Sequence, residues 1–254
     1  MCGRYAVTTD PALLAAEIDA VDETEGTELD VPGYNVAPTT NVVAVVARHS
    51  REQPDEPATR RLRTVRWGLL PSWQKTLSGP PLFNARAESV AEKPAFRTAV
   101  KNKRCLIPMD GWYEWQLLED PEVVKKPRKQ PMYLTPVDGT RMYIAGLWSV
   151  WRPQGAGLDV PPTLSATVLT TEAVGPLREV HDRMPLVLTP DLFDEWLNPD
   201  GPADPGLLLP PGLDVAERIE IRPVSALVNS VKNDGPALIE RAEPGSEPGQ
   251  LSLL

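Results

Sequence analysis

The sequence predicts an α+β domain built on a mixed or antiparallel β-sheet. Three observations support this fold class: many short apolar runs bounded by turn residues, few helical patterns, and 29 prolines among 254 residues. Proline interrupts helices, and short strands between turn residues are typical of sheets without crossover helices. The chain lacks the strand–helix alternation of a doubly wound parallel sheet, an internal repeat and a dividing linker. We therefore expect one domain.

The first half of the chain contains one capped helix and several strands. A helix is expected over residues 10–20, because Asp10 is a suitable N-cap and Pro11 occupies the first helical position. Short β-branched or apolar runs predict the strands. The expected strands are residues 42–47, 63–68, 104–108 and 111–115; loops are expected at 21–30 and 49–60, and a helix in the second half of 86–102.

The second half continues the same pattern of strands and turns. Residues 117–131 are charged and contain prolines, so we expect a hairpin insertion there. Strands are expected at 132–135, 143–148, 165–170 and 220–224, a short helix at 191–197, and Pro/Gly loops at 152–162 and 198–216. The last dozen residues have the composition of a disordered segment, so we expect residues 241–254 to be a flexible tail.

The composition excludes several classes of protein. With 41% hydrophobic and 24% charged residues, the chain can bury a core without disulfides or a metal. No apolar run reaches the roughly 18 residues of a membrane-spanning helix. The first residues lack a secretory pattern, so we expect a cytoplasmic protein with no membrane association. The two cysteines and two histidines have no paired spacing, which argues against a disulfide framework and a structural zinc site.

The net charge of −9 conceals an asymmetry along the chain. Residues 60–130 hold 15 Lys/Arg and 7 Asp/Glu, while the remainder is strongly acidic. A basic segment of this kind can form a local phosphate-binding patch. The alternative is that these charges are scattered over a solvated surface.

Cys2 is the first residue with the potential for chemistry. Removal of Met1 would give Cys2 a free α-amine beside its thiol, and both groups are usable nucleophiles near neutral pH. Such a 1,2-aminothiol reacts with an aldehyde, first forming an imine and then closing a thiazolidine ring. The alternative is a small residue at a frayed chain end.

Two further motifs combine polar and aromatic residues. Asn84 and Arg86 could together hold a sugar-phosphate, because an amide both donates and accepts and a guanidinium matches phosphate geometry. Glu114 lies among three aromatic residues, which would raise its pKa and suit it to acid–base work. The alternative for the first motif is an asparagine in a turn followed by a surface arginine. The alternative for Glu114 is a carboxylate on the polar face of an edge strand.

His181 and Trp73 complete the set of candidates. Histidine is suited to proton transfer near neutral pH, and His181 precedes an apolar strand, whereas His49 lies in a polar loop. Trp73 follows a basic segment and could stack on bases of single-stranded DNA. A structural histidine and a core tryptophan are the alternatives.

Taken in order, these motifs make the chain similar to the SOS-response-associated peptidase family, whose members shield abasic sites in single-stranded DNA by covalent attachment. The resemblance covers nearly all of residues 1–240. It is carried by eight blocks: MCGRY at 1–5, YNVAP at 34–38, WGLLP at 67–71, NARAE at 84–88, CLIP at 105–108, GWYEW at 111–115, HDRMP at 181–185 and VNSVKN at 228–233. It implies a single domain over residues 2–240, beginning at Cys2 after methionine removal, with a barrel-like core and few flanking helices.

The resemblance also implies a role for each candidate. Cys2 would be the nucleophile, Asn84 would position the sugar or the nucleophile, and Glu114 and His181 would be the acid–base pair. The DNA-binding residues would be Arg4 and Arg86 at phosphates, Trp73 at the flanking bases and Thr170 as a polar contact. Relatives commonly carry a second tryptophan after the one matching Trp73; here Gln74 replaces it, which weakens the expected stacking platform.

The implied reaction is capture of the ring-opened abasic aldehyde by Cys2. The thiazolidine would form before the imine promotes strand cleavage, and abasic-site lyase activity would be latent. No metal or organic cofactor is implied. We expect a monomer whose partner is single-stranded DNA containing abasic sites, associated with the nucleoid when bound, with replication-fork proteins as candidate partners.

Two other functions use the same residues. A thiol peptidase would use Cys2 and His181 with Asn84 as an oxyanion donor, either to remove Met1 or to cleave other proteins. A non-catalytic reader of damaged or modified DNA would need only basic and aromatic residues. The three functions have different requirements. Covalent capture needs a free Cys2 amine, a thiol peptidase needs only the thiol, and a non-catalytic reader needs neither.

Overall fold

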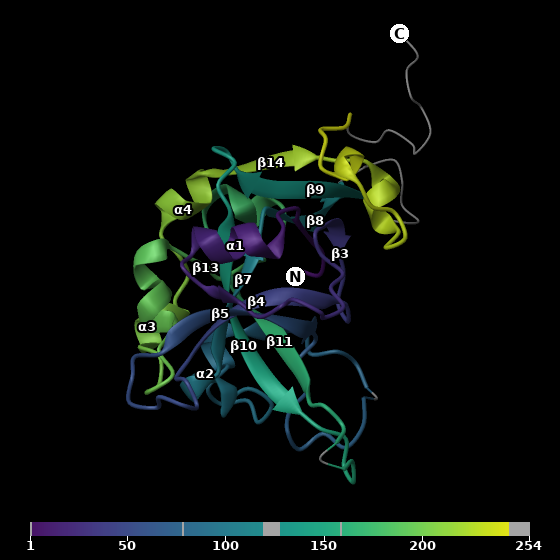
Figure 1. Cartoon of the computed structure of the whole chain (residues 1–254). Coiled ribbons are helices and arrows are strands. Elements are labelled where there is room, and N and C mark those ends of the chain that lie inside the picture. Colours follow the sequence, from purple (N-terminus) through teal and green to yellow (C-terminus); the bar gives the residue numbers. More distant parts are fainter. Residues whose placement is uncertain (1, 78, 119–127, 158, 244–254) are drawn as a thin grey trace.

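A computed structural model describes residues 2–77, 79–118, 128–157 and 159–243. The predicted tip of the hairpin insertion and the predicted tail from residue 244 onward lie outside these residues. The fold is α+β, as predicted, with two sheets and short helices. Figure 1 shows one sheet, with β8, β9 and β14, above the strands of the other.

Five strands of the larger sheet close into a barrel. Four neighbouring pairs are antiparallel, and the parallel pairing of the last strand with β5 completes the ring. The expected barrel-like core is therefore confirmed, and closure removes the unpaired edges of these strands. The ring consists of β5 (Thr59–Trp67), β4 (Asn41–Arg48), β7 (Arg104–Met109), β10 (Met142–Trp151) and β11 (Thr163–Glu172).

Short strands extend the barrel where the site forms. On β11, one end pairs in parallel with β6 (Asn84–Arg86) and in antiparallel fashion with β12 (Arg183–Pro185). Elsewhere β13 (Val187–Leu188) pairs with β10, and β2 (Val21–Asp22) pairs with β5.

The second sheet is open and antiparallel. Its order is β14 (Ile219–Pro223), β9 (Arg128–Pro136), β8 (Gly111–Leu118), β1 (Tyr5–Val7) and β3 (Gly33–Val36). The barrel strand β7 continues through Asp110 into β8, so the chain joins the two sheets directly. This sheet therefore brings the first residues of the chain against the barrel.

Helices are few and short among the described residues. The α-helices are α1 (Pro11–Glu17), α2 (Ala99–Asn102), α3 (Phe193–Leu197) and α4 (Leu213–Glu217). Single 3₁₀ turns span Ala87–Ser89, Gly175–Glu179, Pro190–Leu192, Pro205–Leu208, Ala226–Asn229 and Pro236–Leu238. None of the helices described here combines the length and apolar composition needed to cross a membrane.

Most predicted elements are confirmed, with corrections at the ends. Asp10 caps α1 by accepting from Ala12 N at 2.9 Å, as the sequence indicated. The expected helix within 86–102 is reduced to α2, because residues 91–98 form turns around Pro94. The expected loops at 21–30 and 198–216 contain β2 and α4, respectively. Strands β1, β3, β6, β12 and β13 were not predicted; each has only two to four residues and little periodicity of its own.

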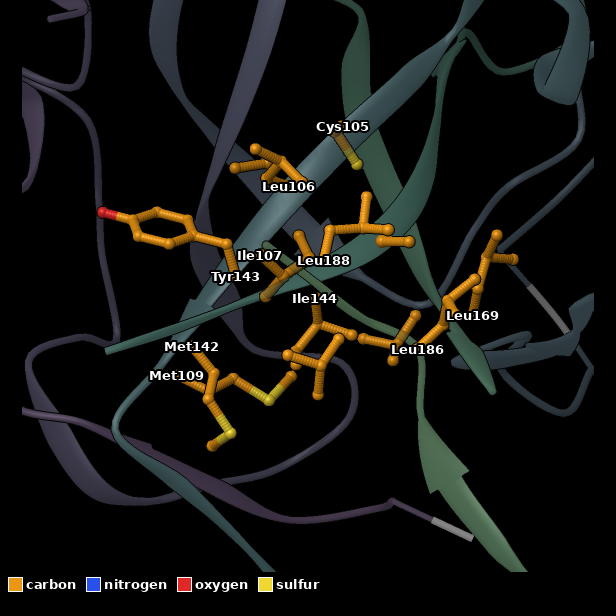
Figure 2. Packing of buried hydrophobic residues seen from close by; sticks show 14 of the residues in the cluster. Cys105, Leu106, Ile107, Met109, Met142, Tyr143, Ile144, Leu169, Leu186 and Leu188 are labelled. Atoms are coloured by element: carbon orange, nitrogen blue, oxygen red, sulfur yellow. The ribbon is translucent and has the colours of Figure 1, made fainter. Parts of the chain in front are cut away.

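The barrel interior supplies the main core. Figure 2 shows the side chains of Ile107, Ile144 and Leu186 packed together inside it. Ile144 and Cys105 have no exposed surface. A separate apolar cluster lies behind the open sheet and contains Ala6, Tyr113, Tyr133, Val224, Val228 and Leu238. The open sheet is thus covered on both faces at Gly111–Glu114, and this double burial fixes the direction of the side chains there.

Candidate active site

Cys2 lies where the two sheets meet. It belongs to the main core cluster and has no exposed surface. The Nδ2 of Asn84, the first residue of β6, donates to the Cys2 carbonyl at 2.7 Å. The pairing of Asn84 with Val168 on β11 anchors this amide to the barrel. One nucleophile candidate is therefore connected to both sheets.

Glu114 approaches Cys2 from the open sheet. Tyr5 pairs with Trp112 on β8, and continuing this antiparallel register places Gly3 opposite Glu114. Side chains alternate along a strand, so Glu114 shares a face with Trp112, which packs in the same cluster as Cys2. Tyr113 points to the other cluster. The alternation of side chains along β8 thus directs the Glu114 carboxylate toward Cys2.

The pKa of Glu114 suits proton transfer at neutral pH. The side chain is 3% exposed, and burial raises its pKa to about 7. The negative charge of Asp182 adds to this shift. Near pH 7 both protonation states of Glu114 are populated, as a residue that both accepts and returns a proton requires.

His181 reaches the site from a turn. It follows the 3₁₀ turn Gly175–Glu179, and the Nε2 of Gln116 on β8 donates to Glu179 O at 3.0 Å. Burial lowers the pKa of His181. The imidazole is therefore neutral at physiological pH.

Two contacts of His181 favour different tautomers. The Arg183 N–H donates to Nδ1 at 2.9 Å, whereas an Asp182 oxygen lies 2.7 Å from the same atom. The backbone N–H cannot turn its hydrogen away, while the Asp182 side chain is 85% exposed and screened by water. We therefore assign Nδ1 as the acceptor, which leaves the ring proton on Nε2.

Burial shifts the pKa of all three titratable groups. It raises the pKa of Glu114 and lowers that of His181. It also raises the pKa of the Cys2 thiol far above its usual range, and the carboxylate of Glu114 raises it further. The thiol is protonated in this state, so a base must act before it becomes a nucleophile.

Arg4 occupies a half-buried position beside this centre. Its Nη1 donates to Asn35 Oδ1 at 2.7 Å and to Val228 O at 2.9 Å. Its guanidinium carbon lies 5.9 Å from the centre of the Trp115 ring. Burial lowers the pKa of Arg4, but the group stays charged. The family resemblance implied a phosphate role for Arg4 but no role for Asn35, whose carbonyl partners lie 193 to 198 positions away along the chain.

Arg86 and Thr170 occupy paired positions with different exposure. They face each other in the β6–β11 ladder, but Arg86 is exposed and Thr170 has no exposed surface. Its burial leaves Thr170 no surface for the expected direct contact with DNA. Its carbonyl instead accepts from Arg183 Nη2 at 2.6 Å, so Thr170 orients that cation.

Arg183 is a feature that we did not predict. It forms two hydrogen bonds with the Glu88 carboxylate, at 2.8 and 2.9 Å, and only 10% of its side chain is exposed. Both residues lie inside motifs that carry the family resemblance. Their occurrence in those motifs was the only signal in the sequence.

Trp73 is the exposed aromatic residue expected from the sequence. It is 65% exposed, in the segment after Pro71. Gln74 is held by the Trp151 Nε1, which donates to the Gln74 carbonyl at 2.6 Å. Trp73 is thus free to stack, while the neighbouring residue is fixed against the barrel.

Several described arginines of the basic segment are engaged within the protein. Arg60 pairs with Asp194, and both Arg61 and Arg63 pair with Glu23. Arg104 is buried, and its guanidinium donates to carbonyls such as Val100 O. Much of the positive charge therefore stabilises the fold. In the part of the chain that the structure describes, no three His, Cys, Asp or Glu side chains are grouped to hold a metal ion.

The chain is similar to proteins of one family. A family model described as SOS response associated peptidase (SRAP) matches residues 1–231. "Abasic site processing protein YoqW" of Bacillus subtilis is 36% identical, over 94% of this chain and 99% of that protein. "Abasic site processing protein YedK" of Escherichia coli is 31% identical with the same coverage, and "Abasic site processing protein HMCES" of Xenopus tropicalis is 27% identical over 93% of this chain and 77% of that protein.

Solved structures show the same fold. A Bacteroides thetaiotaomicron protein aligns with a TM-score of 0.72 at 21% identity, over 95% of this chain and all of that chain. A Bordetella bronchiseptica protein aligns with a TM-score of 0.67 at 26% identity, over 88% of this chain and all of that chain. Because the family model spans nearly the whole chain and relatives exceed 30% identity over almost their full length, this chain belongs to the SOS response associated peptidase family.

Proposed function

We propose that this chain captures abasic sites in single-stranded DNA by a covalent bond to Cys2. The observation that carries the proposal is the convergence of Asn84 and Glu114 on Cys2, with Asp182, the neighbour of His181, close enough to Glu114 to act on its pKa. The names of the relatives identify them as abasic site processing proteins. We further propose that the functional chain begins at Cys2, within one domain of residues 2–240.

The first step opens the sugar. An abasic deoxyribose is in equilibrium with an aldehyde, and opening the ring requires a donor at the ring oxygen. His181, neutral and protonated at Nε2, acts as a hydrogen-bond donor that polarises this oxygen. Glu114 in its ionised form takes a proton from the Cys2 amine and keeps it nucleophilic.

The second step forms the ring. The Cys2 amine adds to the aldehyde carbon and water leaves, giving an imine. The thiol then adds across the C=N bond: sulfur bonds to carbon and the thiol proton ends on nitrogen. One water is released overall, and no oxidant or cofactor enters. Ring closure removes the imine before it promotes elimination of the 3′ phosphate.

Arg86, Trp73 and Arg4 provide the proposed contacts with DNA. Arg86 and Trp73 are exposed, and Arg4 is a half-buried cation beside Cys2. Contacts with phosphates and base stacking carry no strong sequence preference, so binding should weaken steeply with salt.

The experiment is intact mass measurement of the protein, alone and with a single-stranded oligonucleotide carrying one abasic site. We expect a protein without Met1 and an adduct equal to protein plus DNA minus one water. The adduct should survive heating without borohydride, which an imine would not. Cys2→Ala and an oligonucleotide without the lesion are the controls. A protein lacking Met1 that forms no adduct would overturn the proposal and favour a peptidase or a passive reader.

We also propose that the chain removes its own Met1, with Glu114 assisting the Cys2 thiol. Cellular aminopeptidases also remove Met1 before a small residue, so the test compares Glu114→Gln with the parent chain. Retention of Met1 in Glu114→Gln supports self-processing, because Cys2 is unchanged there. Complete removal of Met1 from Glu114→Gln assigns the step to the cell.

A further inference from the structure

Asn35 uses every polar atom of its side chain within the protein. Its Oδ1 accepts from Arg4 Nη1 at 2.7 Å. Its Nδ2 donates to Ser230 O at 2.9 Å and to Asn233 O at 2.8 Å, with Val228 O at 3.4 Å. The residue is 8% exposed. One amide thus connects the start of the chain with the segment at 228–233.

Among the residues that the structure describes, the Arg4 guanidinium donates only to neutral acceptors. They are the Asn35 amide oxygen and the Val228 carbonyl, and the Trp115 ring lies beside the cation. Two other partly buried arginines pair with carboxylates: Arg141 with Asp110 and Glu17, and Arg183 with Glu88. Arg104 donates to carbonyls as Arg4 does, but it is 3% exposed. A cation that is partly desolvated but not neutralised keeps its full charge for an anion from outside.

Arg4 is also close to the nucleophile along the chain. Its backbone N–H bonds to the Cys2 sulfur and lowers the pKa of that thiol. Its carbonyl accepts from Tyr113 N at 2.9 Å, next to Glu114. The backbone of Arg4 is therefore fixed in the β1–β8 ladder, and only its side chain depends on Asn35.

We propose that Asn35 is a positioning residue that holds the Arg4 guanidinium as an uncompensated cation directed at a phosphate of the bound strand. An amide suits this task better than a carboxylate, because it orients the guanidinium without cancelling its charge. The same amide holds the 228–233 segment, whose Val228 carbonyl is the other acceptor of Arg4. The proposal rests on the proposed function, because it requires that Arg4 face DNA.

The test uses single-stranded DNA without a lesion, so that binding is measured apart from crosslinking. The logarithm of the dissociation constant is determined against the logarithm of the salt concentration. Asn35→Asp keeps the shape of the side chain but places a negative charge on Arg4. Loss of one phosphate contact on a single strand should reduce the slope by about 0.7. Arg4→Ala should produce the same change.

Asn233→Ala is the matched control. Its Nδ2 donates to Leu227 O at 2.8 Å within the same segment, but its side chain touches neither Asn35 nor Arg4. We expect it to leave the slope unchanged. Thermal unfolding of each variant checks folding, and Asn35→Ala replaces Asn35→Asp should the aspartate disrupt the segment.

Two results would overturn the proposal. One is a parental slope in Asn35→Asp or in Arg4→Ala. The other is a further loss of DNA affinity when Asn35→Ala is added to Arg4→Ala, since a residue that acts through Arg4 has no effect once Arg4 is gone. Crosslinking to an abasic strand is scored separately, so failure of covalent capture and failure of this inference are distinguishable.

Discussion

The two sheets hold the site by different means. The barrel contributes Asn84 and His181 through elements that are paired to, or follow, its strands, and its interior is apolar. The open sheet contributes Cys2, Arg4 and Glu114, and side-chain amides such as Asn35 hold its edge. Apolar burial gives the barrel its stability, while directional hydrogen bonds give the open sheet its geometry. We therefore expect substitutions in the barrel to change stability, and substitutions in the open sheet to change reactivity.

The largest effect is expected where the two sheets meet. Cys2→Ser retains the amine but replaces the thiol with a weaker nucleophile, so the imine forms without efficient ring closure. We expect the heat-stable adduct to disappear and strand cleavage at the abasic site to appear, measured on denaturing gels. A variant that neither crosslinks nor cleaves would contradict the assignment of Cys2 as the imine-forming residue.

A cavity in the barrel tests whether that region acts as a scaffold. Ile144 has no exposed surface, and Ile144→Ala should lower the free energy of unfolding by about 2–5 kcal/mol. Below the melting temperature its crosslinking rate should stay near that of the parent chain. Urea unfolding and single-turnover crosslinking measure the two effects, with Ile144→Val as a milder control. A large loss of crosslinking rate in a folded Ile144→Ala protein would contradict the expectation that barrel substitutions change only stability.

Glu114→Gln removes the carboxylate charge from β8 and keeps the shape of the side chain. Because burial raises the pKa of Glu114 to about 7, the parent crosslinking rate should rise with pH through that value, and Glu114→Gln should lose this dependence once its Met1 has been removed with an added methionine aminopeptidase. The rate is measured from pH 5 to 9. A parent profile that is flat around pH 7, or a Glu114→Gln profile that still rises there, would exclude Glu114 as the base.

The raised pKa of Glu114 also affects the stability of the fold. The folded state binds a proton at Glu114 more tightly than the unfolded state, so this group destabilises the fold as the pH rises from about 4.5 to 7. The shift corresponds to at most about 3 kcal/mol. Glu114→Gln should therefore be more stable than the parent at pH 8 and similar at pH 4.5. Urea unfolding at the two pH values gives the result, and equal stability at pH 8 would contradict the raised pKa.

The smallest effect is expected at the Glu88–Arg183 pair. Glu88 is 43% exposed, and its hydrogen bonds with Arg183 lower its pKa. Because such exposed pairs contribute little, Glu88→Gln should reduce stability by less than about 1 kcal/mol. Affinity for single-stranded DNA should rise slightly, since Arg183 loses its counter-charge. Thermal unfolding and a binding titration measure these changes, and weaker DNA binding would argue that Glu88 is needed to orient Arg183.

The sequence alone determined the fold class and the residues with reactive chemistry. Short β-branched or apolar runs predict β4, β7, β10 and β11, because a strand buried in a barrel is apolar along most of its length. Asp10 followed by Pro11 predicts the start of α1 from local geometry alone. The chemistry of Cys2, Glu114 and His181 is a property of the side chains themselves.

Only the tertiary structure decided which of these residues meet and what holds them. Asn84 and Cys2 are 82 positions apart, and Asn35 bonds carbonyls nearly 200 positions away. Thr170 proved buried because both β6 and β12 flank it on β11, a pairing that no local pattern encodes. The pKa of Glu114 likewise depends on burial and on charges from other segments. Local sequence fixes backbone preference and side-chain chemistry, whereas long-range strand pairing sets distance and desolvation, and these last two determine reactivity.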